Sequence, residues 1–238
     1  MTHSLHREGR PDSLERDYVL FVYPSKGFNY KGSAPKVRHL TELIHQSGPV
    51  NIMAKTRRRK IAGGAKPEDA PEGIMVEGTN AYCVYNNRDK LPIDTIQFDG
   101  TRVYSVFNSL EKLKEALARI KEADEGISVV ISGRIDRVRE IAAEIGIDPH
   151  MVNLSLGIHG RTDRLPPADI REFTTMCGHG LVSPHLVRDT IRRLKTGKVS
   201  EENACEILAK PCLCGIHNPS RSAELLREKA PLYTVDRW

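Results

Sequence analysis

Hydrophobic residues between positions 17 and 160 fall into short β-like runs and amphipathic helical stripes. Tyr18–Tyr23 is an unbroken apolar run rich in β-forming residues, which predicts a strand buried on both faces. Pro35 then opens a helix whose apolar positions recur every three or four residues. A second strand is predicted over residues 50–54, and Asp99-Gly100 between alternating residues predicts a hairpin over 96–107.

From Ser109 onward the pattern alternates between helix and strand. Ser109 is a favourable cap for a helix that extends to about Ala123. A strand over 127–132, a helix over 135–145 and a strand over 151–156 follow, which is the spacing of a βαβ unit with two parallel strands. We therefore expect an α/β fold with a mixed, partly parallel sheet in about residues 17–160.

After Pro166 every predicted element is a helix. These helices span residues 167–174, 183–196, 200–209 and 219–229. Met1–Arg16 is polar and has no apolar stretch of the kind found in secretory signals, which predicts a disordered tail and a cytoplasmic protein. The expected organisation is a tail over 1–16, an α/β domain over 17–160 and a helical section over 161–238.

Composition and charge restrict the function only a little. With 39% hydrophobic and 28% charged residues, the chain has the composition of an ordinary globular protein, and its apolar runs are too short to cross a membrane. Much of the net charge of +5 comes from the cluster that includes Arg57–Lys60. We expect a solvated loop there, with contact to nucleic-acid phosphates as the alternative.

Three of the five cysteines lie in polar, glycine-broken loops of the helical section. Met176-Cys177-Gly178-His179-Gly180 precedes a predicted helix, whose positive end favours a thiolate. Pro211-Cys212-Leu213-Cys214-Gly215 holds two thiols two residues apart in a stretch unsuited to a helix, and His217 follows. Cys83, in a predicted strand, and Cys205, on an apolar helix face, are expected in the core. An odd number of cysteines without a signal sequence predicts reduced thiols, available for metal binding or catalysis.

The three thiols support three interpretations. In the first, which we expect, Cys177, Cys212 and Cys214 ligate three irons of a [4Fe–4S] cluster. The fourth iron would then act as a Lewis acid in a dehydration, a sulfur transfer or an isomerisation, as in a lyase or transferase. In the second, zinc is bound by the same thiols with His179 or His217, although the spacing matches neither common zinc-finger pattern. In the third, no metal is present, and Cys177 and His179 are catalytic acid or base groups.

The string Met176–Gly180 resembles the catalytic-cysteine segment of proline racemases and hydroxyproline epimerases. In those enzymes the thiol exchanges a Cα proton, so the resemblance implies a proton-transfer role for Cys177. It covers five residues, and Pro211–Gly215 departs from the Asp-Arg-Ser-Pro-Cys-Gly-Thr context of the second cysteine in that family. Epimerase-like chemistry is therefore an alternative to the metalloenzyme. A non-enzymatic RNA- or protein-binding module with a structural metal site is the other alternative.

Residues suited to a small anionic substrate occur in three loops. Lys26 and Lys31 lie in a glycine-punctuated loop after the first strand, and Arg134 precedes a helix. His159 and Arg161 follow the last predicted strand, and His159 is a further candidate for catalysis. Because ligands of open α/β sheets bind beyond the carboxyl ends of the strands, we expect these residues to form a phosphate or carboxylate site facing the thiols.

Overall fold

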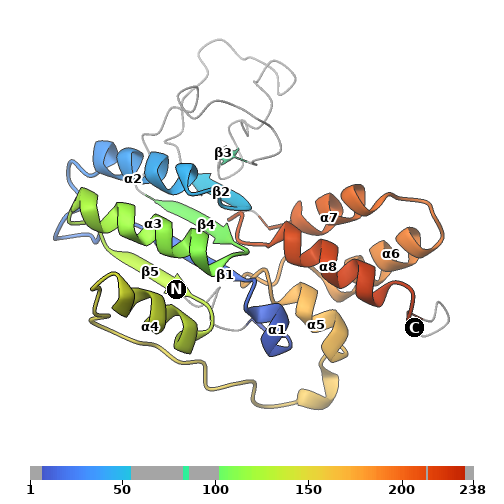
Figure 1. The fold of residues 1–238 in the computed structure, drawn as a ribbon. Coiled ribbons are helices and arrows are strands. Elements are labelled where there is room, and N and C mark those ends of the chain that lie inside the picture. The colour runs from blue at the N-terminus through green and yellow to red at the C-terminus, as the bar shows by residue number, and fades with distance from the viewer. Residues whose placement is uncertain (1–6, 55–82, 86–101, 213, 234–238) are drawn as a thin grey trace, which may run out of the picture.

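The computed structural model describes residues 7–54, 83–85, 102–212 and 214–233 (Figure 1). Arg57–Lys60 and the predicted turn at Asp99-Gly100 lie outside these residues. The strands are β1 (Tyr18–Val22), β2 (Asn51–Ala54), β3 (Cys83–Tyr85), β4 (Val103–Phe107) and β5 (Val129–Ser132). The helices are α1 (Pro11–Leu14), α2 (Ala34–Gln46), α3 (Leu110–Ala123), α4 (Ile135–Glu144), α5 (Ala168–Thr174), α6 (Pro184–Lys195), α7 (Glu201–Ala209) and α8 (Pro219–Lys229), with a 3₁₀ turn at Thr162–Arg164.

The sheet has the strand order β3-β2-β4-β1-β5, and every neighbouring pair is antiparallel. Helix α2 connects β1 to β2 across β4, while α3 connects β4 to β5 across β1. Two interlocked crossovers of this kind make the split βαβ, or ferredoxin-like, arrangement, a name that refers to connectivity and not to iron–sulfur content. Strand β3 extends the sheet beyond β2.

The prediction of a partly parallel sheet is wrong, although the mixed α/β class is right. Strand β5 pairs antiparallel with β1, so that Val19 faces Ser132 in the register. Residues 151–156 form no strand, and the side chains of Leu154 and Leu156 are 68% and 87% exposed. The sequence spacing predicts a strand parallel to β5 directly after it in the sequence. In the structure, the nearest strand parallel to β5 is β4, which comes earlier in the sequence and is separated from β5 by β1 in the sheet.

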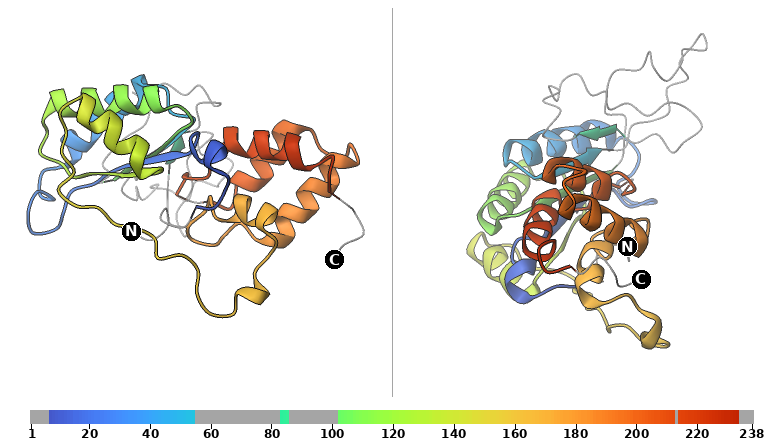
Figure 2. Two further views of the ribbon diagram at one scale, coloured as in Figure 1. Left: turned by 60° about the horizontal axis from the view of Figure 1, so that its bottom comes forward. Right: turned by 90° about the vertical axis from the view of Figure 1, so that its right-hand side faces the viewer.

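Both faces of the central strands are covered. Tyr18, Leu20 and Val22 pack with residues of α2, α3 and α4 on one face. Val19 and Phe21, on the other face, belong to one buried cluster with residues of the helical section formed by α5 to α8, which lies beside the end of the sheet near Asp17 (Figure 2). All five residues of β1 are fully buried, which confirms a strand buried on both faces. The second layer consists of the C-terminal helices and not of crossover helices of a parallel sheet, so the cysteines of that section belong to a core built on the sheet.

Helix positions agree with the sequence pattern because local signals set their ends. The hydroxyls of Ser109, Ser183 and Ser200 accept a backbone N–H three residues further on, and the Asn218 side chain does the same for α8. The four helices predicted after Pro166 are confirmed to within one or two residues at each end. In the part of the chain that the structure describes, no helix has both the length and the apolar character needed to cross a membrane.

Residues 7–16, part of the segment predicted as a tail over 1–16, have a defined place in the structure. Residues 7–17 lie against the helical section and include α1. The Glu8 N–H donates to Thr175 Oγ1 at 3.0 Å. The buried guanidinium of Arg221 donates to Ser13 Oγ at 2.9 Å and to the Glu8 carbonyl at 2.6 Å. Part of the polar character of this segment thus reflects partners inside the protein.

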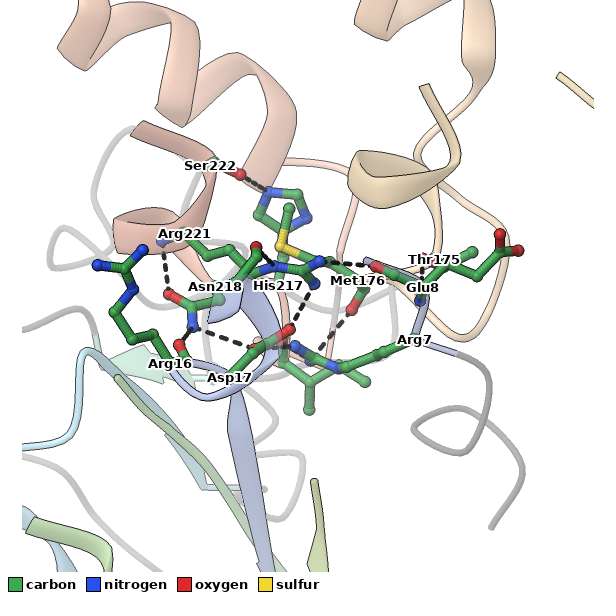
Figure 3. Close-up of polar contacts among 12 residues, drawn as sticks. Arg7, Glu8, Arg16, Asp17, Thr175, Met176, His217, Asn218, Arg221 and Ser222 are labelled. Atoms are coloured by element: carbon green, nitrogen blue, oxygen red, sulfur yellow. Dashed lines mark hydrogen bonds and ion pairs between the residues drawn. The ribbon is translucent and has the colours of Figure 1, made fainter. Parts of the chain in front are cut away.

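A fully buried carboxylate, Asp17, lies at the centre of these contacts (Figure 3). It pairs with Arg7 and with Arg221, at 2.8 Å for the latter, and accepts a hydrogen bond from Asn218 Nδ2 at 3.0 Å. Burial raises the pKa of Asp17, but the two guanidiniums and Asn218 outweigh burial and hold this pKa below its ordinary value. The charged carboxylate therefore joins the N-terminal segment, β1 and the start of α8.

Asp17→Asn is expected to lower the free energy of unfolding by about 3–5 kcal/mol, because two buried guanidiniums lose their counter-charge. Since the pKa of Asp17 is lowered in the folded state, its contribution is present above the unfolded-state pKa of about 4 and is lost as the pH falls through the folded-state pKa. Urea unfolding between pH 3 and pH 7 should show this acid-dependent loss in the parent and a smaller one in the variant.

The control is Asp12→Asn, which removes an exposed carboxylate paired with Arg10 in the same segment. This variant should leave the unfolding curve nearly unchanged. Equal destabilisation by the two substitutions would contradict the central role of Asp17.

Candidate metal centre

Three buried cysteines and one exposed histidine gather at the margin of the second core, the buried cluster that Val19 and Phe21 share with residues of α5 to α8. Cys212 Sγ lies 3.7 Å from Cys214 Sγ, and Cys214 Sγ lies 3.5 Å from His179 Nδ1. The thiols of Cys177 and Cys212 are close enough to shift each other's pKa. The structure therefore brings together all three cysteines predicted to bind metal, with His179 as a fourth donor. Cys205 lies in the same core on α7, as expected of a packing residue.

One type of turn builds both donor loops. The carbonyl of Cys177 accepts the N–H of Gly180 at 2.9 Å, and that of Cys212 accepts the N–H of Gly215 at 3.0 Å. The two glycines have left-handed φ angles of +69° and +68°, a conformation that a side chain would strain. In each turn the first and third residues carry the donor groups. The shared pattern Cys-x-(His or Cys)-Gly is a sequence signal that considering each loop separately misses.

Backbone N–H groups are directed at all three sulfur atoms. They come from His179 and Leu181 for Cys177, from His217 for Cys212 and from Ile216 for Cys214. A thiolate accepts such hydrogen bonds more strongly than a thiol does, so each of them lowers the pKa of its sulfur. The two turns therefore provide an environment suited to sulfur anions.

The three thiols nevertheless compete for ionisation. Hydrogen bonding to Cys212, and then burial, raise the pKa of Cys177 far above its ordinary value. Hydrogen bonding from Cys177 lowers the pKa of Cys212, but the bond with Cys214, burial and repulsion outweigh it and raise that pKa to about 11. Hydrogen bonding from Cys212 lowers the pKa of Cys214. Cys214 is thus the first thiol to ionise, and a nearby cation would favour ionisation of the other two.

His217, a candidate ligand or proton carrier from the sequence, has a structural position. Its side chain is fully buried, and its Nε2 lies 2.6 Å from Ser222 Oγ (Figure 3). Burial, with repulsion from Arg7, lowers the pKa of His217 to about 3, so the ring is neutral at pH 7. The backbone N–H of His217 lowers the pKa of Cys212, while its buried imidazole pairs with Ser222.

The predicted anion-binding residues do not lie with the thiols. Lys26 and Lys31 are exposed in the loop after β1, at the end of that strand opposite Asp17 and away from the helical section (Figure 1). Arg134 pairs with Glu15 and Asp136. The expected convergence depended on parallel strands, whose carboxyl ends would share one edge of the sheet.

Two further loop residues have local partners. The ring of His159 lies 2.9 Å from the carbonyl of Leu156, and Arg161 pairs with Asp163 at 2.7 Å. Both His159 and Arg161 are exposed. Neither is placed by these contacts at the thiol cluster.

Over the described ranges, no three or more His, Cys, Asp or Glu side chains already stand around one point as metal ligands would. A metal at the thiol cluster therefore requires some of its donor side chains to rotate. The CxC pair is close already, since its two sulfurs are in contact.

Iodoacetamide should modify Cys214 about tenfold faster than Cys177 or Cys212 in the reduced, metal-free protein near pH 7, because the thiolate is the reactive species. Peptide mass spectrometry after timed labelling measures the three rates. Buried Cys205 should be modified only on unfolding, which provides the internal control. Faster modification of Cys177 or Cys212 than of Cys214 would count against this order of ionisation.

Comparisons of this chain with protein-family models, with curated proteins and with solved structures give no match.

Proposed function

We propose that the chain is a metalloenzyme whose metal is held by Cys177, Cys212 and Cys214, with His179 at a fourth, solvent-facing position. The observation that carries this proposal is the pair of equivalent turns, which gathers four soft donors and supplies every thiol with a backbone N–H. Thiolate and imidazole donors favour zinc and iron over magnesium and calcium.

The spacing of the sulfurs supports a single metal ion as the occupant. Two thiolates bound to one tetrahedral ion at about 2.3 Å stand about 3.8 Å apart, and the Sγ atoms of Cys212 and Cys214 are 3.7 Å apart. Thiolates on different irons of a [4Fe–4S] cluster stand roughly 6 Å apart. A cluster therefore needs the CxC pair to open, whereas a single ion needs only Cys177 and His179 to turn inward.

Metal binding would also allow all three thiols to be ionised together. A divalent cation replaces the protons that Cys177 and Cys212 otherwise retain, and the backbone N–H groups then donate to three thiolates. With a neutral His179, such a centre carries a net charge of about −1. The high pKa values in the metal-free protein are thus consistent with a site completed by a cation.

The exposure of His179 supports catalysis at the fourth position. The three thiols are buried, so His179 is the donor that water or a substrate can replace. Catalytic metal sites keep one such position open, and a group bound there is polarised by the metal. If a cluster is the occupant, the same position belongs to the iron without a thiolate, which suits lyase or transferase chemistry. Lys26, Lys31, Arg134 and Arg161 are not part of the proposed centre.

Metal-free proton transfer between thiols has less support. Exchange of a Cα proton needs acid and base groups on either side of the substrate carbon. The thiols of Cys177 and Cys212 instead interact with each other. The contact also raises the pKa of Cys177, which disfavours its use as a base at neutral pH.

The test is the metal and sulfide content of protein purified anaerobically and reconstituted with zinc or with iron and sulfide. We expect about one ion per chain without sulfide. About four irons with sulfide per chain would identify the cluster instead and would retain the same centre. Cys177→Ala, Cys212→Ala and Cys214→Ala should each lose most of the metal.

Cys205→Ala is the matched control, since Cys205 is equally buried in the same core. This variant should keep the full metal content. A reconstituted parent that binds neither metal, or equal loss in the Cys205 variant, would overturn the proposal.

A further inference from the structure

One side chain from the N-terminal segment contacts both donor turns. The guanidinium of Arg7 donates to the carbonyl of Met176 at 3.2 Å and to the carbonyl of Ile216 (Figure 3). Met176 directly precedes Cys177, and Ile216 lies two residues after Cys214. Arg7 thus bridges the two turns from outside either of them.

Arg7 is itself held firmly in this position. Its side chain is 5% exposed and pairs with Asp17, which Arg221 and Asn218 fix in turn. The planar guanidinium has enough donors to serve a carboxylate and two carbonyls together. A lysine ammonium is a single point charge and cannot span the same three acceptors.

Other contacts hold each turn separately. The Glu8 N–H donates to Thr175 Oγ1, two residues before Cys177. The Asn51 side chain, at the start of β2, donates to the Gly215 carbonyl at 2.7 Å. Apart from the contact between Cys214 Sγ and His179 Nδ1, these contacts leave Arg7 as the link from one turn to the other, so its loss should loosen their association while each turn keeps its own anchor.

We propose that residues 7–17 form a latch, with Arg7 as a positioning residue that holds the two metal-binding turns together. The inference rests on the proposed function, because the latch keeps the four donors within reach of one metal. For the ligands to separate, Arg7 must release one of the two carbonyls. Arg7 also brings a positive charge to a centre whose thiolates exceed the charge of a divalent ion.

The first experiment measures the release of metal from the loaded protein to excess EDTA. Arg7→Gln should release metal about tenfold faster than the parent, because the charge-assisted hydrogen bonds to both carbonyls are lost. Arg7→Lys keeps the charge but not the bridge, and its release rate should lie between those of the parent and Arg7→Gln. The matched control is Arg10→Gln, an exposed residue of the same segment that pairs with Glu228; its rate should stay within about twofold of the parent.

The second experiment needs no metal and measures iodoacetamide labelling of the metal-free protein. Arg7→Gln should speed the labelling of Cys177 and Cys214 by about tenfold while Cys205 stays protected. Faster labelling of Cys205 as well would indicate general unfolding and would count against a local latch. This readout separates a latch from a merely structural arginine.

The two experiments fail in distinguishable ways. A parent that binds no metal, but whose Cys177 and Cys214 are labelled about tenfold faster in Arg7→Gln while Cys205 stays protected, would keep the latch and overturn the metal centre. A metal-binding parent with unchanged release and labelling in Arg7→Gln would keep the centre and overturn the latch. If Arg7→Gln does not fold, the proposal is tested with Arg7→Lys, which retains a positive charge beside Asp17. Metal release and thiol labelling at the parent rates in Arg7→Lys would overturn the proposal.

Discussion

The structure depends on one buried negative charge that two buried arginines share. Asp17 alone would be costly to bury, and so would either guanidinium, but their combination with Asn218 and several backbone carbonyls satisfies most of the polar atoms. The members come from the N-terminal segment, the start of β1 and the start of α8, so the network can form only when these segments are correctly placed. Specificity of arrangement is therefore its main contribution, more than net stability.

Next to this network, the face of the sheet that carries no crossover helices is also buried. A split βαβ sheet carries its own helices on one side, and here Val19, Phe21 and Val106 on the other side join a second buried cluster with residues of α5 to α8. The donor turns lie at the margin of that core, so the sulfurs are buried while His179 reaches solvent. Burial alone would favour neutral thiols; the backbone N–H groups of the two turns oppose this effect, and the resulting balance makes a cation a suitable occupant.

The sequence is most informative where local rules decide the structure. Apolar stripes and caps such as Ser109 locate the helices, and the glycines and prolines around Cys177, Cys212 and Cys214 distinguish these thiols from Cys205 in the core. Local rules do not reveal partners far along the chain. The polar residues before Asp17 have the composition of a solvated tail, although Arg7 and Glu8 bind groups near residues 175 and 216. Strand direction is equally nonlocal, which explains both the incorrect parallel pairing of β5 and the incorrect grouping of Lys26 and Lys31 with the thiols.

The hydrogen bonds from Arg7 to the two turns also constrain the order in which parts of the chain can fold during synthesis. Arg7 and Ile216 are 209 positions apart, so one acceptor of Arg7 is synthesised long after Arg7 itself. The strands and helices of the split sheet are complete by residue 144 and involve shorter separations, which favours their earlier formation. Until α5 to α8 follow, the second face of that sheet is an uncovered apolar surface, the kind of surface that chaperones recognise. Closure of the donor turns is thus a late step, and any metal would be acquired by a chain whose sheet has already folded.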